Sequence, residues 1–219
     1  MTPPSQRGRY SAHGVEAEFE PGSRGRVLRN LQDVRSVREM ARLESERLLA
    51  ATQRLIDETE VEQRFRAEDI CRMHKLWLED IYAWAGEYRQ VNIGKDGFMF
   101  AAAHLIPGLM REFERGPLRE YTPCRFATVE EQAYALAVVH AELILIHPFR
   151  EGNGRCTRLL ATLMGLQAGL PVLNFGGIRG EEKKRYIGAV HAAAGRDYAP
   201  MSAVFRRVIA RTLRVQKRA

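Results

Sequence analysis

Residues 147–158, His-Pro-Phe-Arg-Glu-Gly-Asn-Gly-Arg-Cys-Thr-Arg, separate two apolar segments with helical patterning, 134–146 and 159–170. This arrangement predicts a tight loop between two buried helices, with Gly152, Asn153 and Gly154 leading into the second one. A helix start offers free N–H groups and the positive end of the helix dipole, so it can bind an anion. Glycine also lets the backbone approach a ligand closely. We therefore expect these three residues to cradle phosphates, although Asn153 is equally a favourable N-cap.

The charged side chains of the loop complete the requirements of phosphate-transfer chemistry. His147 is a candidate general base, and Glu151 is an oxygen ligand suited to holding Mg²⁺ against phosphates. Arg155 and Arg158 are three positions apart, so on a helix they share a face, and guanidinium groups there suit phosphate oxygens.

Each of these residues also has a purely structural interpretation. His147 can be a helix-terminal histidine stabilised by the dipole, and Glu151 a carboxylate at a helix N-terminus. Arg155 and Arg158 can form surface ion pairs. The phosphate-site interpretation is preferred because a base, a carboxylate, a backbone cradle and two arginines fall within twelve residues.

The loop resembles the signature of the Fic (filamentation induced by cAMP) family, His-Pro-Phe-x-Asp/Glu-Gly-Asn-Gly-Arg-x-x-Arg. Every specified position is met. The resemblance continues upstream through residues 81–89 and 95–100 and downstream through 186–198, so it covers about residues 28 to 205. It implies an all-α fold, a helical bundle with one short β-hairpin called the flap.

The resemblance also implies a protein adenylyltransferase that uses ATP and Mg²⁺. His147 would take the proton from a Tyr, Thr or Ser hydroxyl of a target protein, and that oxygen would attack the α-phosphorus. Glu151 would hold the metal, and Arg155 and Arg158 the phosphates. Glycine at position 154 goes with AMP transfer in the family, whereas the Doc branch, with another residue there, acts as a kinase. Tyr186 is expected near the adenine.

Residues 88–100 differ from the rest of the chain, because apolar residues alternate there around a polar turn. This pattern predicts a β-hairpin. It resembles the family's flap, which binds the target segment by strand addition. The alternative is a hairpin without a role, with Lys95 as a solvated turn residue. The flap residues are Gly94, Lys95, Asp96, Gly97 and Phe98, of which Lys95 and Asp96 are also expected to contact the nucleotide.

Helical periodicity accounts for most of the remaining chain. We expect residues 27–219 to form one domain and residues 1–26, rich in Pro, Gly and Arg, to form a flexible arm. Two possible capping boxes, Ser36 with Glu39 and Thr128 with Glu131, begin helices. Helices are predicted at 36–58, 67–83, 102–119, 128–146, 152–168, 180–194 and 199–215.

Charge and cysteine content indicate the expected kind of partner and the cellular compartment of the protein. The net charge is +7, but the basic and acidic residues are interspersed, which favours a solvated surface over a nucleic-acid partner. Cys71, Cys124 and Cys156 are far apart and odd in number, as in a reduced, cytoplasmic protein. The sequence shows neither a signal peptide nor an apolar run that could span a membrane.

The family often carries an inhibitory helix, Ser/Thr-x-x-x-Glu-Gly/Asn, and no serine or threonine here has glutamate four positions later. The resemblance therefore implies a toxin-like protein that is inhibited by a separate small antitoxin, whose glutamate would pair with Arg158. Two alternatives stay open: the same loop transfers another nucleotide or a phosphoryl group, or the chain is a non-catalytic nucleotide-binding regulator. His74, His104 and His191 are interpreted as structural.

Overall fold

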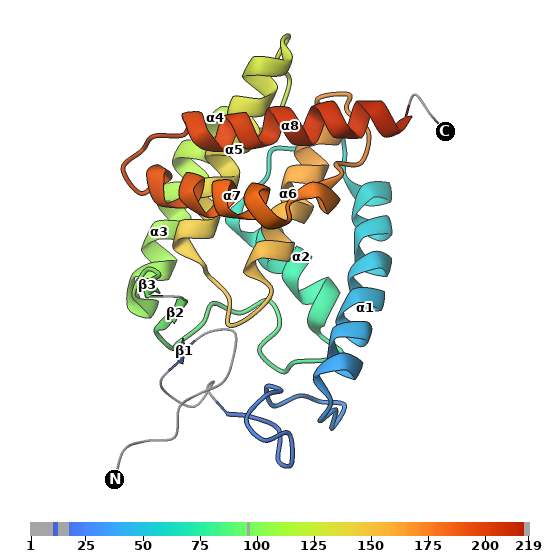
Figure 1. The fold of residues 1–219 in the computed structure, drawn as a ribbon, viewed down its shortest axis with the longest axis vertical. Helices are drawn as coiled ribbons and strands as arrows, with labels where there is room; N and C mark the ends of the chain where they lie inside the picture. The colour runs from blue at the N-terminus through green and yellow to red at the C-terminus, as the bar shows by residue number, and fades with distance from the viewer. Residues whose placement is uncertain (1–10, 13–17, 96, 217–219) are drawn as a thin grey trace.

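The computed structural model describes residues 11–12, 18–95 and 97–216. The fold is mainly helical, as predicted (Figure 1). Six of the seven expected helices form, five of them within about two residues of the predicted bounds. They are α1 (Val37–Glu58), α2 (Ala67–Leu78), α5 (Val129–Ile146), α6 (Asn153–Gln167), α7 (Gly180–Ala193) and α8 (Ala199–Gln216).

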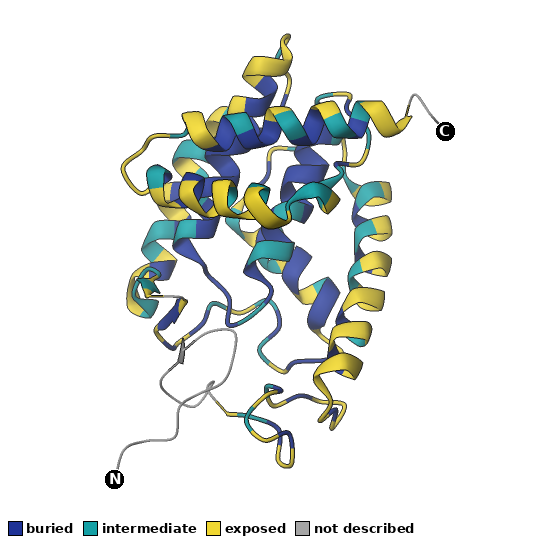
Figure 2. Ribbon diagram, in the orientation of Figure 1, coloured by how far each residue is buried: buried dark blue, intermediate teal, exposed yellow. Residues whose placement is uncertain are grey.

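Helix α5 is the centre of the core. The predicted capping box at its start is confirmed, since Glu131 N–H donates to the Thr128 hydroxyl and Thr128 N–H donates to the Glu131 carboxylate. Most residues of α5 are buried, which leaves no polar face for solvent (Figure 2). Helices α6, α7 and α8 pack against it. The end of α5, where the 147–158 loop begins, is therefore fixed from several sides.

Helix α1 lies beside α2 and forms a second, smaller core with it (Figure 1). Ser36 caps α1 by accepting a hydrogen bond from Glu39 N–H. The buried side chains Met40 and Ala51 of α1 belong to the same cluster as Trp77 and Leu78 of α2. This cluster places the middle of α1 next to the part of α2 that faces the loop.

Two helix predictions are corrected by the structure. Helix α2 ends at Leu78 rather than at residue 83, and turns lead from there to Gly86, whose φ is 85°. The expected helix at 102–119 is broken, because Pro117 has no N–H and its ring cannot follow a regular turn. A wider π turn accommodates it. The segment consists of a 3₁₀ turn (Ala103–Leu105), α3 (Ile106–Phe113), the π turn (Glu114–Leu118) and α4 (Arg119–Tyr121).

The predicted hairpin is confirmed: β2 (Ile93–Lys95) pairs antiparallel with β3 (Phe98–Met99). The sequence did not indicate a third strand, β1 (Ser11–Ala12), whose backbone pairs with Gly94 and Ile93 on the other edge of β2. Asp96 lies outside the described residues. So do residues 1–10 and 13–17 of the expected flexible arm, and the domain boundary at residue 27 stays a prediction.

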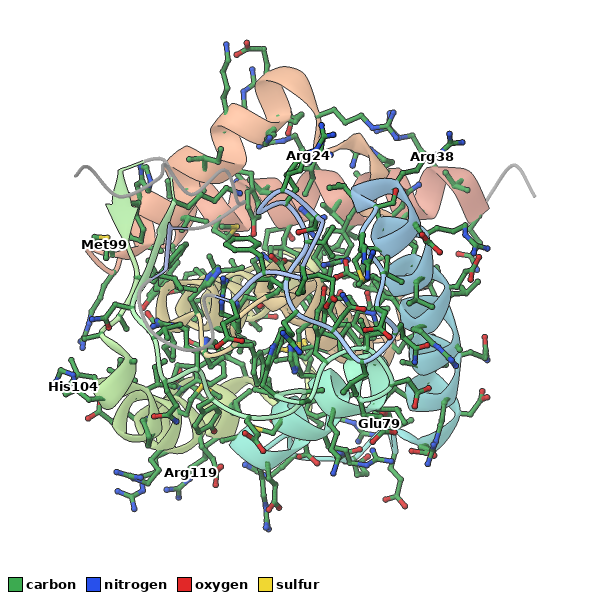
Figure 3. All side chains as sticks on the ribbon, turned by 90° about the horizontal axis from the view of Figure 1, so that it is seen from below. Arg24, Arg38, Glu79, Met99, His104 and Arg119 are labelled. Atoms are coloured by element: carbon green, nitrogen blue, oxygen red, sulfur yellow. The ribbon has the colours of Figure 1, made fainter. Side chains whose placement is uncertain are left out.

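The three cysteines are free thiols, as predicted. Among the described residues, none of the helices combines the length and the apolar character that crossing a membrane requires. Side chains around the rim of the molecule point outward, including His104 and Arg119 (Figure 3). His104 is exposed, and its interpretation as a structural residue stays a prediction.

Three histidines are buried inside this helical body. Burial lowers the pKa of His74 to about 4 and the pKa of His140 and of His147 to about 3. His140 has its Nε2 atom 2.8 Å from the Tyr186 hydroxyl. All three imidazoles are therefore neutral in the folded protein at pH 7.

These buried histidines predict a fall in stability under mildly acidic conditions. Their folded pKa values lie below the value of about 6.5 in an unfolded chain, so the unfolded state binds more protons as the pH falls. We expect the free energy of unfolding to decrease from pH 6.5 to pH 5, by up to about 1.4 kcal/mol per pH unit for each histidine. Urea unfolding at a series of pH values measures this slope.

The matched variants are His140→Gln and His191→Gln. His140 is buried and His191 is exposed. In the first variant the slope should fall by the contribution of about one proton. The second variant removes an exposed imidazole and controls for the substitution itself. Equal slopes for both variants would contradict the assignment to buried imidazoles.

Candidate active site

His147 occupies an unusual backbone position at the end of α5. Its φ and ψ are 52° and 60°, in the left-handed region, and its N–H donates to Leu143 O at 3.0 Å. Its Nδ1 lies 3.0 Å from Ile144 O. A carbonyl oxygen only accepts hydrogen bonds, so Nδ1 carries the proton and Nε2 carries the lone pair. With its pKa lowered to about 3 by burial, the imidazole is a neutral base at pH 7.

The residues that surround the imidazole belong to the hairpin and to the segment that precedes β2. The ring of Phe100 is stacked on the His147 ring, with 3.6 Å between centroids. Arg89 and Lys95 also lower the pKa of His147, although less than burial does. Sequence reasoning did not identify Arg89, whose side chain is 1 % exposed and donates from Nε to His147 O at 2.8 Å.

The loop itself is closed by Asn153 and anchored by Phe149. The Asn153 side chain accepts from Phe149 N–H at 2.8 Å and donates to Phe149 O at 2.7 Å. These bonds use the side chain to close the loop, and the N-cap of α6 is Gly152, not Asn153. The Phe149 ring is buried and stacked on His74, with 3.9 Å between centroids.

His74 also bonds the loop, and sequence reasoning gave no partner for it. Its Nδ1 accepts from Gly86 N–H at 2.8 Å, so Nε2 carries the proton and donates to Glu151 O at 3.1 Å. The neutral form set by burial is the form that makes both bonds. His74 thus ties α2 to the loop.

The start of α6 supplies the predicted backbone donors. Asn153 and Gly154 are in its first turn, where N–H groups have no partner within the helix. Gly152 N–H donates to the Glu151 carboxylate at 2.9 Å. Gly152 has φ 83°, and a Cβ there would lie 2.7 Å from Trp77 Cζ3. A Cβ on Gly154 would meet none of the described atoms within 4 Å.

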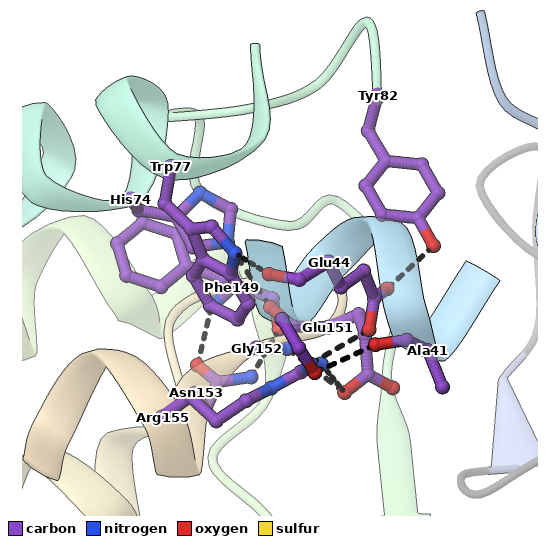
Figure 4. Close-up of polar contacts among 11 residues, drawn as sticks. Ala41, Glu44, His74, Trp77, Tyr82, Phe149, Glu151, Gly152, Asn153 and Arg155 are labelled. Atoms are coloured by element: carbon purple, nitrogen blue, oxygen red, sulfur yellow. Dashed lines mark hydrogen bonds and ion pairs between the residues drawn. The ribbon is translucent and has the colours of Figure 1, made fainter. Parts of the chain in front are cut away.

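Arg155 lies in a network that extends to α1 (Figure 4). Its Nη1 is 2.7 Å from Glu44 Oε2, and its Nη2 is 3.5 Å from Glu151 Oε1. The guanidinium lies over the Trp77 ring at 4.5 Å. Glu44 is buried and also accepts from the Tyr82 hydroxyl at 2.9 Å. Glu44 is a second residue that sequence reasoning missed.

Arg158 faces a different part of the protein, so the two arginines do not share one set of neighbours. Its guanidinium carbon is 5.7 Å from the Phe175 ring centroid and 5.9 Å from that of Tyr186. Within the described part of the chain, no ion pair engages Arg158, and its buried Nε has no hydrogen-bond partner. A half-buried guanidinium without a carboxylate partner suits an anion.

The described residues contain no group of three or more His, Cys, Asp or Glu side chains that could hold a metal ion alone. Glu151 is a single carboxylate at the loop, and its side chain is 12 % exposed. One carboxylate together with substrate phosphates is a common way to bind Mg²⁺. The donor set at Glu151 therefore fits a metal that arrives with a nucleotide.

The hairpin borders the site through Phe100, and its tip points away from the core. Lys95 and Met99 are exposed, and Met99 projects at the edge of the molecule (Figure 3). Gly97 has φ 82°, as the predicted turn requires. The Phe98 ring is stacked on His191, with 5.2 Å between centroids. The expected contacts of Lys95 and Gly94 with nucleotide and target stay predictions.

Comparison with known proteins gives a match to the Fic/DOC family model over residues 64–164. Probable protein adenylyltransferase y4lH of Sinorhizobium fredii is 31 % identical over 138 residues, which is 63 % of this chain and 69 % of that protein. Protein adenylyltransferase VbhT of Bartonella schoenbuchensis is 29 % identical over 143 residues, 65 % of this chain but only 30 % of VbhT.

Solved structures show the same fold at lower identity. BepC of Bartonella tribocorum, solved with bound AMPPNP, has a TM-score of 0.68 and 21 % identity, covering 83 % of this chain and 91 % of that one. A Fic domain of Bartonella quintana, solved with bound ADP, has a TM-score of 0.69 and 21 % identity, covering 87 % and 92 %.

The two glycines of the loop predict opposite outcomes when each is changed to alanine. Gly152→Ala should destabilise the fold by about 1–3 kcal/mol, because its φ is positive and the new Cβ would collide with Trp77. Gly154→Ala should change stability by less than about 0.5 kcal/mol yet weaken nucleotide binding, because its Cβ fills space beside the free N–H groups. Urea unfolding and nucleotide titration measure the two effects. Unchanged nucleotide affinity in Gly154→Ala would exclude this backbone as the phosphate cradle.

Proposed function

The chain belongs to the Fic/DOC family, and we propose that it is a protein adenylyltransferase that moves AMP from ATP to a Tyr, Thr or Ser hydroxyl of a target protein. The observation that carries this proposal is the neutral His147 with its lone pair on Nε2. This base precedes the start of α6, where backbone N–H groups and Arg158 can bind phosphates. Relatives named protein adenylyltransferase support the same activity.

In the proposed reaction His147 Nε2 takes the proton of the target hydroxyl. The hydroxyl oxygen then forms a bond to the α-phosphorus while the bond between that phosphorus and the bridging oxygen of pyrophosphate breaks. The first-turn N–H groups of Asn153 and Gly154, with Arg158, would stabilise the charge that develops on the phosphates. Lys95 and Asp96 are proposed to contact the nucleotide from the hairpin, and Tyr186 to lie near the adenine.

We assign Glu151 as the protein ligand of Mg²⁺. Bound there, the metal would neutralise phosphate charge as it does in other phosphoryl-transfer enzymes. Arg155 is held at 2.7 Å by Glu44 and only at 3.5 Å by Glu151. Of the two carboxylates, that of Glu151 is thus the more distant from Arg155.

Regulation is proposed to come from a separate small antitoxin that supplies a glutamate to Arg158. The support is that Arg158 has no ion-pair partner among the described residues, together with the lack of the inhibitory sequence pattern. The free protein would then be toxin-like.

Because its three cysteines are free thiols, we propose that it acts in the reducing cytoplasm.

Labelled ATP tests the activity directly. Purified protein with Mg²⁺ and cell lysate should transfer label to a protein from α-labelled ATP and not from γ-labelled ATP. His147→Ala should reduce the transfer by at least about 100-fold, since a general base contributes this much, while nucleotide affinity is kept. Label from γ-labelled ATP would favour a kinase. ATP binding without transfer to any protein would favour the non-catalytic nucleotide-binding regulator.

The pH dependence of the transfer tests the state of the base. His147 must be neutral to accept a proton, and its pKa is lowered to about 3. The rate should therefore stay nearly constant from pH 8 down to pH 5.5, instead of halving near the ordinary histidine pKa of about 6.5. Single-turnover rates with α-labelled ATP measure the profile. Half-maximal activity near pH 6.5 would show that this imidazole titrates normally.

A further inference from the structure

Arg89 is a fully buried cation in the segment between α2 and β2, and the proposed reaction does not use it. Its side chain is 1 % exposed. Its backbone N–H donates to Pro148 O at 2.9 Å, next to the candidate base. A buried charge is costly unless hydrogen bonds satisfy it, so its partners show what this residue does.

The guanidinium of Arg89 donates to three backbone carbonyls. Nε bonds His147 O at 2.8 Å, Nη1 bonds Val91 O at 2.6 Å, and Nη2 bonds Ala101 O at 2.5 Å. Val91 lies two residues before β2, and Ala101 lies two residues after β3. One planar group thus connects both stems of the hairpin to the backbone of the base.

The backbone of His147 needs such support. A residue with a Cβ seldom adopts the left-handed region, and it does so stably only where neighbouring groups hold it. Arg89 holds the carbonyl of this residue, while Phe100 from the hairpin covers its ring at 3.6 Å. Arg89 therefore holds the main chain of His147, and Phe100 holds its side chain.

We propose that Arg89 is a positioning residue that fixes the hairpin and His147 in one geometry, so that an acceptor segment docked on the hairpin meets Nε2 of His147. The inference rests on the proposed function, because it takes His147 as the base. Arg89 touches carbonyls rather than reacting atoms, so it acts through their positions. The rigid fork of arginine suits this task, and lysine cannot bond three carbonyls in the same plane.

Two variants separate positioning from charge. Arg89→Lys keeps the cation but loses the fork, and Arg89→Met loses both. We expect both to lower the AMP-transfer rate on the order of 10- to 100-fold, as small misplacements of reacting groups do, with nucleotide affinity changed by less than about twofold. Arg64→Lys is the matched control, because Arg64 donates to the carbonyl of Arg119 instead.

The titration of His147, followed by NMR of labelled histidine, adds a readout that a general loss of stability would not produce. Among the described residues, Arg89 and Lys95 are charged groups that lower the pKa of this imidazole. Arg89→Met should raise the pKa of His147, whereas Arg89→Lys should leave it nearly unchanged although the transfer rate falls. If Arg89→Met does not fold, the comparison of Arg89→Lys with wild type still decides the question.

Amide hydrogen exchange tests the connection without relying on catalysis. Phe100 N–H donates to Ile93 O within the hairpin, and we expect its exchange to become faster in both Arg89 variants and to stay unchanged in Arg64→Lys. Wild-type transfer rates in a folded Arg89→Lys, or unchanged exchange at Phe100, would overturn the proposal. If the wild-type protein transfers no AMP, the proposed function fails, and the exchange experiment still tests the connection by itself.

Discussion

The left-handed backbone of His147 is the constraint on which the site depends. Helix α5 is buried on nearly all sides, so its end cannot move without disturbing the core. The chain must then reverse within a few residues to begin α6 at Asn153. The turn at His147 starts this reversal, and the Asn153 side chain closes it on the backbone of Phe149. The same geometry that joins two buried helices places a neutral imidazole before a helix N-terminus.

Burial has a chemical as well as a structural effect here. It keeps His74 and His147 neutral, and each forms a hydrogen bond through the nitrogen that carries the proton. For His147 the remaining nitrogen has the lone pair. The protein therefore selects a tautomer through packing and one carbonyl contact.

Local signals were enough to predict much of the fold. The capping residues Ser36 and Thr128 located the starts of two helices, and the polar turn within an alternating pattern located the hairpin. The apolar periodicity on both sides of Pro117 predicts one continuous helix, and it does not reveal the interruption that Gly116 and Pro117 cause. Strand β1 was missed because two residues carry no periodicity.

The candidate residues of the loop could be recognised from the sequence, because they lie close together in it. The residues that contact and hold the loop could not be recognised, because they are far from it in the sequence. Glu44 and its partner Arg155 are 111 residues apart in the sequence, His74 and Glu151 are 77 residues apart, and Arg89 and His147 are 58 residues apart. Each support is a common residue whose partner becomes evident only after folding. Burial of charged side chains such as Arg89 and Glu44, visible only in the structure, is the signal that identifies them.

The contact between Glu44 and Arg155 extends the structural unit around the loop to residues before the family match. The family match starts at residue 64, yet Glu44 belongs to α1, which precedes it. A helix outside the matched region thus supplies the closest carboxylate to an arginine of the signature loop. The matched region is therefore shorter than the structural unit around the loop: a fragment that begins at residue 64 would keep every signature residue and lose the carboxylate that holds Arg155.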